Sequence, residues 1–101
     1  MDSVLTLIGV QKDQNSLGEY VKSSETKQEV LGTVESVTRA EWYQAGREGK
    51  NPEIVFTTPI VNYSGEQEAE LNGIRYSIYR TYMANESDEI ELYLERKAGV
   101  Q

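Results

Sequence analysis

Short runs in which apolar and polar residues alternate recur along the chain, and they predict a set of short β-strands. The first run, Ser3 to Val10, has apolar residues in both alternating sets, which predicts a strand buried on much of both sides. The second, from about Glu29 to Val37, contains Gly32, which suggests a bulge. A third strand is predicted at Ile54 to Phe56. Pro59, which follows it, suits a bend or an edge but not a central position.

The C-terminal third contains the clearest hairpin signal. The pair Asn72-Gly73 can supply the two positive φ angles of a type I′ turn between alternating segments. A second turn, Ala84 to Asp88, leads into a last strand. Alternation predicts an inward and an outward set of side chains in each strand. The inward set comprises Ile74, Tyr76, Ile78, Tyr82, Ile90, Leu92 and Leu94, and the outward set includes Arg75, Tyr79, Glu89, Glu91, Tyr93 and Glu95.

One short α-helix, about residues 39–48, is predicted between the second and third strands. Thr38 can accept a hydrogen bond from the backbone N–H of Glu41 while the Glu41 carboxylate reaches back to the N–H of Thr38, which is a capping box. Gly49 can adopt the left-handed conformation that ends a helix. We expect Trp42, the only Trp, to fill the core and Tyr43 to lie nearer the surface.

These elements predict a mainly β fold in which five or six strands form a small antiparallel sheet, rolled into a barrel or a sandwich, with one inserted helix. Of the two, we expect the barrel. A chain this short must curl its sheet to hide the strand edges. At 101 residues it should form a single domain, residues 1–101. The segment Gln11 to Gln28 is mostly polar, and we interpret about residues 11–24 as a long polar loop.

The composition excludes most catalytic chemistry. The chain has no Cys and no His, so it lacks thiolate chemistry, the commonest metal ligand and the usual general base. Glu89, Glu91 and Glu95 are expected to be solvated and paired with cations such as Arg75, rather than to form a metal or acid–base cluster. We therefore predict no enzymatic activity, no metal and no cofactor.

The charge balance also bears on partners. There are 17 Asp and Glu against 10 Lys and Arg, a net charge of −7, which disfavours tight nucleic-acid binding. Arg80 with its neighbouring tyrosines could form a stacking platform for single-stranded nucleic acid, but the surrounding negative charge favours ordinary strand positions. The N-terminus does not look like a signal peptide and no segment is long enough to span a bilayer, so we expect synthesis in the cytoplasm.

Three motifs occur in a fixed order along the chain. They are the aromatic-aromatic-Gln-Ala unit at Trp42 to Ala45, the Lys50-x-Pro52-Glu53 entry to the third strand and the NGIRYSIYRTY hairpin at Asn72 to Tyr82. With the closing IELYLE, this set resembles the head-closure, or head–tail joining, proteins of tailed bacteriophages and prophages with long non-contractile tails. The likeness covers nearly the whole chain.

The resemblance implies a structural protein of the virion, made in the host cytoplasm. It implies a homo-oligomeric ring, a dodecamer in the virion, with the portal and adaptor above and a tail-completion protein below. The isolated chain is expected to be monomeric or weakly associating. DNA would pass through the ring without sequence-specific binding, and no membrane would be involved. The alternative is a small cellular β-barrel that binds another protein and has no catalytic activity.

The resemblance also implies which segments reach other molecules. Loops at Gln11 to Lys22 and Thr57 to Gln67 are expected to project into or across the DNA channel. The outer side of the helix is expected to contact a neighbouring subunit. The channel-loop candidates are Lys12, Asp13, Asn15, Glu19 and Lys22, and the interface candidates are Tyr43, Arg47 and Lys50.

Overall fold

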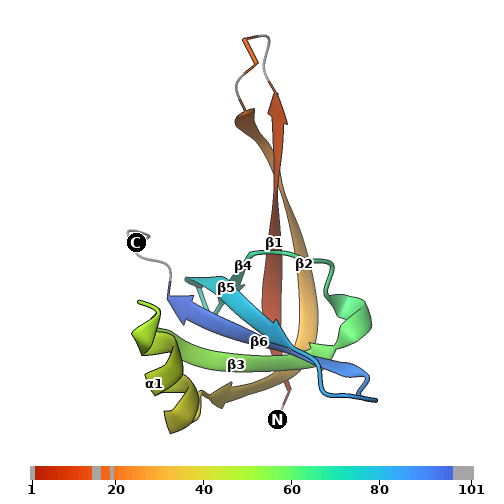
Figure 1. Cartoon of the computed structure of the whole chain (residues 1–101). Coiled ribbons are helices and arrows are strands. Elements are labelled where there is room, and N and C mark those ends of the chain that lie inside the picture. The colour runs from red at the N-terminus through yellow and green to blue at the C-terminus, as the bar shows by residue number, and fades with distance from the viewer. Residues whose placement is uncertain (1, 15–16, 19, 97–101) are drawn as a thin grey trace.

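The computed structural model describes residues 2–14, 17–18 and 20–96. This part of the chain is mainly β, as predicted, with six antiparallel strands closed into a barrel in the order β1-β2-β3-β6-β5-β4 (Figure 1). In the same residues one short α-helix, α1, lies outside the barrel. The elements are β1 (Asp2–Gln14), β2 (Tyr20–Ser36), α1 (Arg39–Arg47), β3 (Pro52–Pro59), the 3-10 helix η1 (Ile60–Asn62), β4 (Glu68–Leu71), β5 (Ile74–Tyr82) and β6 (Glu89–Arg96).

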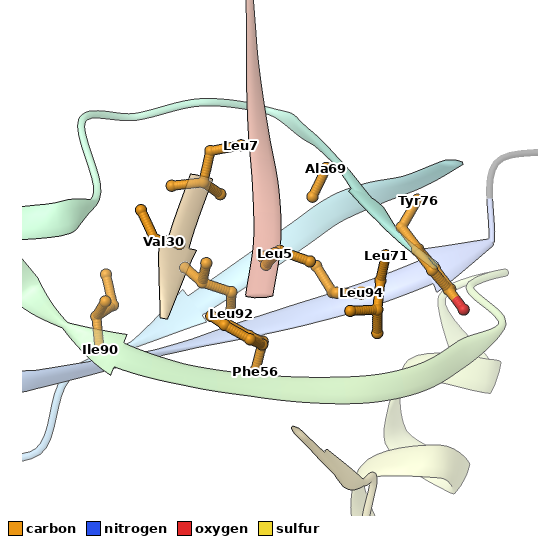
Figure 2. Close-up of a cluster of buried hydrophobic side chains, with 10 residues drawn as sticks. All are labelled: Leu5, Leu7, Val30, Phe56, Ala69, Leu71, Tyr76, Ile90, Leu92 and Leu94. Carbon is orange, nitrogen blue, oxygen red and sulfur yellow. The ribbon is translucent and has the colours of Figure 1, made fainter. Parts of the chain in front are cut away.

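Hydrophobic side chains from all six strands meet inside the barrel, and most of them are aliphatic; β3 contributes Phe56 and β5 contributes Tyr76 (Figure 2). Phe56, Leu92 and Leu94 are fully buried. Phe56 thus has the central place that the sequence assigned to Trp42. On β1, the side chains of Leu5 and Leu7 on one face and of Ile8 on the other are fully buried, whereas Val4 is half exposed. The predicted burial of both faces of this strand is therefore confirmed only in part.

Gly32 is needed for packing rather than for a bulge. A Cβ atom at this position would collide with the backbone oxygen of Thr57 and would lie 2.6 Å from Cε2 of Phe56, closer than non-bonded atoms approach one another. The pairing of β1 with β2 is regular there, with Ser3 opposite Gly32, and the register shifts instead between Gln11 and Lys12. The predicted bulge at Gly32 is therefore wrong.

β1 and β2 form a hairpin that extends far beyond the barrel (Figure 1). β1 pairs with β4 only over Thr6–Ile8, and β2 pairs with β3 only over Thr33–Ser36. We call residues 9–14 and 20–28 the arm. The interpretation of residues 11–24 as a polar loop is wrong, because the strand pairing continues to Gln14 and Tyr20. A two-stranded ribbon outside the core buries neither face, so its sequence need not alternate.

The C-terminal hairpins follow the predicted pattern closely. Asn72 and Gly73 have φ angles of 53° and 82°, which confirms the type I′ turn between β4 and β5. The inward residues of β6 are confirmed: Ile90, Leu92 and Leu94 are buried.

A bulge in β5 was not predicted. The register with β6 shifts between Ile78 and Arg80, and beyond it Tyr82 lies opposite Glu91. Residues directly opposite one another share a face. Because Glu91 is on the outer side, Tyr82 points outward and is half exposed, so its predicted inward position is wrong.

The segment Thr57 to Gln67 does not project. β3 continues to Pro59, η1 follows, and Ile60 and Tyr63 pack against the core. The hydroxyl of Tyr63 donates to the backbone oxygen of Glu66 at 2.7 Å. This segment covers the barrel, so the prediction of a second projecting loop is wrong.

Candidate functional site

Helix α1 has well-defined ends that were predictable from the sequence. Thr38 Oγ1 accepts from the backbone N–H of Glu41 at 3.1 Å, which confirms the N-cap. At the other end, Lys50 N donates to Ala45 O at 2.9 Å and Gly49 N to Gly46 O at 3.1 Å, with Gly49 at φ 81°. This pair of hydrogen bonds is a Schellman motif. Hydrogen bonds therefore define both the start and the end of α1.

The inner face of α1 is attached to the barrel through Glu41. Its carboxylate does not return to Thr38, so the second half of the predicted capping box is wrong. It accepts instead from the Tyr79 hydroxyl at 2.7 Å and from Arg80 Nε at 3.2 Å, and forms an ion pair with Arg80 Nη2. Charge-assisted bonds to a guanidinium are stronger than a bond to one backbone N–H. The Arg80 hydrogen bonds lower the pKa of Glu41.

The neighbouring aromatic residues are engaged within the protein. The guanidinium carbon of Arg80 lies 3.8 Å from the ring centroid of Tyr93, a cation–π contact. Tyr93 donates to Glu91 at 2.7 Å, and burial raises its pKa to about 12. Tyr76 is buried and donates to Glu53 at 2.8 Å. These contacts hold β5, β6 and α1 together. Arg80 and the rings bonded here are therefore engaged within the protein and do not form a platform on which nucleic-acid bases could stack.

The outer face of α1 carries two exposed aromatic residues between two arginines. Arg39, Tyr43 and Arg47 are spaced by four residues and so form one stripe along the helix. Trp42 lies beside this stripe. Trp42 and Tyr43 are 54% and 61% exposed, and their rings meet edge to face with 5.3 Å between the ring centroids. We call Arg39, Trp42, Tyr43 and Arg47 the helix patch.

The helix patch corrects the prediction for Trp42. Trp42 does not fill the core, because α1 docks on the outside of the barrel through Glu41 and the buried Ala45. Tyr43 is at the surface as predicted. A shallow hollow beside both rings is lined by Val37, Thr38, Arg39, Trp42 and Tyr43.

The predicted interface residues separate into two groups. Tyr43 and Arg47 lie together in the helix patch, joined by Trp42 and Arg39, which sequence reasoning did not select. The spacing of four between Arg39, Tyr43 and Arg47 was the signal that could have found the set. Lys50 lies beyond the helix, with Nζ 3.8 Å from Glu95 Oε2, and faces the barrel rather than the patch.

Three of the channel-loop candidates, Lys12, Asp13 and Lys22, fall on the arm. Lys12 is opposite Lys22 and Asp13 is opposite Val21 in the strand pairing. Asn15 and Glu19 lie outside the described residues.

The acidic residues of β6 do not form a common site. Glu91 accepts from Tyr93, and Glu95 accepts from Asn51 N at 3.0 Å. Arg75 pairs with Glu68 and with Glu25, so its predicted pairing with β6 is wrong. Across the described ranges, no three Asp or Glu side chains are grouped so that they could hold a metal ion.

No helix in the described part of the chain has the length and apolar character needed to cross a membrane. The sequence matches no protein-family model and no curated protein. What this protein binds must therefore be inferred from the chemistry of its own surfaces.

Proposed function

We propose that the protein is a structural component of a bacteriophage virion that joins the head to the tail. It acts as one subunit of a ring on the portal–adaptor connector, and it closes or lines the DNA channel after packaging. The observation that carries this proposal is the arm. A closed barrel forms a compact wall unit, while a two-stranded ribbon reaches well past it (Figure 1).

The distribution of charge supports a channel role. The chain has a net charge of −7, and DNA phosphates slide past an acidic surface more readily than past a basic one that holds them by counterion release. Three of the arginines are engaged by carboxylates: Arg75 by Glu68, Arg80 by Glu41 and Arg96 by Glu53. Their positive charge is largely neutralised locally.

The helix patch supports assembly with other protein subunits. Trp, Tyr and Arg are the residue types enriched where binding energy concentrates in protein interfaces. Trp42 is exposed and lies near Arg39 and Arg47, so a role in such an interface would explain its position outside the core.

The alternative is a small cellular β-barrel that binds another protein and has no catalytic activity. The hollow beside Trp42 and Tyr43 favours it, because a peptide side chain could enter there. A pull-down from a host lysate that lacks phage proteins would then recover one partner with the wild type and not with Trp42→Ala.

Co-sedimentation with purified portal–adaptor connectors tests the proposed function. The full chain is expected to sediment with connectors and not with portal rings that lack the adaptor. If it stays in the supernatant with both at saturating concentration, the proposal is contradicted and the cellular binding module is favoured.

A further inference from the structure

A second exposed surface lies at the end of β3 opposite to α1. Val61 in η1 is 88% exposed, and Met83, at the turn after β5, is 55% exposed. A hydrogen bond from Ile60 N to Asp88 O at 2.8 Å holds η1 against this turn. The turn that carries Met83 and the start of β6 also carry three exposed acidic residues, Glu86, Asp88 and Glu89. We call Val61, Met83, Glu86, Asp88 and Glu89 the acidic end.

The helix patch and the acidic end lie on opposite sides of the barrel. α1 precedes β3 and η1 follows it directly, so β3 separates the two surfaces. Figure 1 shows α1 and η1 on opposite sides, with the arm directed away from the line between them. Contacts through both surfaces would therefore leave the arm free.

The two surfaces are complementary in charge. Arg39 and Arg47 form no ion pair with any described residue, whereas Arg75, Arg80 and Arg96 all do. Within the same described ranges, the carboxylates of Glu86, Asp88 and Glu89 also have no ion-pair partner. In a chain with a net charge of −7, unpaired arginines beside exposed aromatic rings stand out. Each surface has an apolar centre and charges of one sign.

We infer that the helix patch of one copy docks on the acidic end of the next copy. Trp42 and Tyr43 pack against Val61 and Met83, while the arginines meet the carboxylates. This is a heterologous contact, which repeats from subunit to subunit and closes into a ring where the rotation allows. A contact between two helix patches would place four arginines together, and like charges across an interface are costly. The inference rests on the proposed function, because a ring needs two different, complementary patches on one chain.

Charge reversal on each surface tests the contact. We expect the wild type to self-associate in sedimentation velocity runs as its concentration rises to the millimolar range, and to do so less at high salt. Arg39→Glu with Arg47→Glu, or Glu86→Lys with Glu89→Lys, should each weaken association at least roughly tenfold, because like charges then face one another. Mixed in equal amounts, the two variants should associate again, since every contact in an alternating assembly pairs opposite charges.

A matched control separates this contact from a general effect of charge. Glu29→Lys with Glu35→Lys makes the same change in net charge as Glu86→Lys with Glu89→Lys, at exposed positions of β2 that belong to neither surface. This variant should associate as well as the wild type or better. Circular dichroism of each variant confirms that the fold is retained.

Two results would overturn the inference. One is a wild type that remains monomeric throughout the range, and the other is a mixture of the two reversed variants that does not associate while the wild type does. Neither depends on binding to connectors. Self-association without connector binding would remove the proposed function and leave this contact standing, and connector binding by a strictly monomeric chain would do the reverse.

Discussion

At the scale of single residues, Glu41 shows how local signals and tertiary contacts compete. The sequence correctly predicted that Thr38 caps α1, because that bond joins residues three apart. It could not predict that Glu41 leaves the cap to bind Tyr79 and Arg80, which are 38 and 39 residues away along the chain. Trp42 was misplaced for the same reason: with Glu41 held by β5, the helix turns Trp42 outward.

Replacing Glu41 by Ala should destabilise the protein by about 2 kcal/mol, because Tyr79 and Arg80 lose a charged hydrogen-bond acceptor in a partly buried place. Urea unfolding at neutral pH measures the free energy of unfolding. Glu48→Ala, at the exposed C-cap at the other end of α1, is the control and should change it by no more than about 0.5 kcal/mol. Equal effects of the two substitutions would show that Glu41 does not attach α1.

The contribution of Glu41 should depend on pH. The Arg80 hydrogen bonds lower its pKa in the folded state, so between the folded and unfolded pKa values the unfolded chain binds more protons. Its stabilisation is therefore present above the ordinary glutamate pKa and is lost as the pH falls through the lowered one. The difference in unfolding free energy between wild type and Glu41→Gln should shrink over that acidic range. A constant difference would contradict the assignment.

The fall in stability at alkaline pH should reflect Tyr79 and Tyr93, because burial raises the pKa of both hydroxyls above the ordinary tyrosine value. Burial raises the pKa of Tyr93 to about 12, so folding favours its protonated form. This contribution is present below the ordinary tyrosine pKa and is lost as the pH rises through the raised one. Tyr93→Phe should reduce the fall in stability between the two values. The difference between spectrophotometric tyrosinate titrations of the wild type and Tyr93→Phe isolates Tyr93 among the seven tyrosines. An ordinary pKa for Tyr93 in this difference would contradict its burial.

Gly32→Ala should destabilise the barrel by about 1–3 kcal/mol, because the added methyl group collides with the backbone oxygen of Thr57 and overpacks the ring of Phe56. Gly46→Ala is the matched control, since a Cβ there meets nothing within 4 Å and the position is helical. It should be neutral or stabilise by about 0.5–1 kcal/mol. Thermal unfolding of both variants provides the comparison.

At the scale of elements, the strands whose side chains alternate between the core and the solvent could be predicted from the sequence. The hairpin at Asn72-Gly73 and the inward set of β6 could be predicted because a core face enforces alternation. The arm could not, because its strands extend beyond the barrel and their polar residues resemble those of a loop. The bulge between Ile78 and Arg80 was missed because the aromatic and apolar residues of β5 fit either face. The helix patch was partly predicted, through Tyr43 and Arg47.

Tyr43→Ala with Arg47→Ala should leave the fold intact and weaken assembly on connectors, because both side chains lie in the helix patch and α1 is held from its other face. Gln44→Ala, exposed on the same helix, should have no effect. Co-sedimentation with connectors and a melting curve distinguish assembly from stability. Normal assembly of the double variant would mean that these side chains make no essential contact.

Shortening the arm should separate its role from that of the barrel. Replacing residues 12–23 by Asn-Gly keeps Gln11 opposite Ser24 and supplies a two-residue turn. The barrel should fold and bind connectors, since β1 and β2 keep all their contacts with β4 and β3. Heads completed with this variant should lose DNA. Full DNA retention would show that the arm is dispensable.

At the scale of the whole molecule, the predicted barrel is confirmed while the role in the virion remains the proposal that best explains its surfaces. The barrel supplies a compact unit, the helix patch and the acidic end lie on opposite sides, and the arm points away from both. This division of surfaces fits a ring subunit that contacts its neighbours laterally and reaches toward the channel.

The most direct test is DNA retention by phage heads assembled without this chain. Such heads, filled with DNA and incubated with the purified protein, should keep their DNA and then accept tails, as measured by nuclease protection and infectivity. The Arg39→Glu, Arg47→Glu variant should fail in the same assay. If the wild type neither protects the DNA nor permits tail joining, the account of this protein as the unit that closes the head is contradicted.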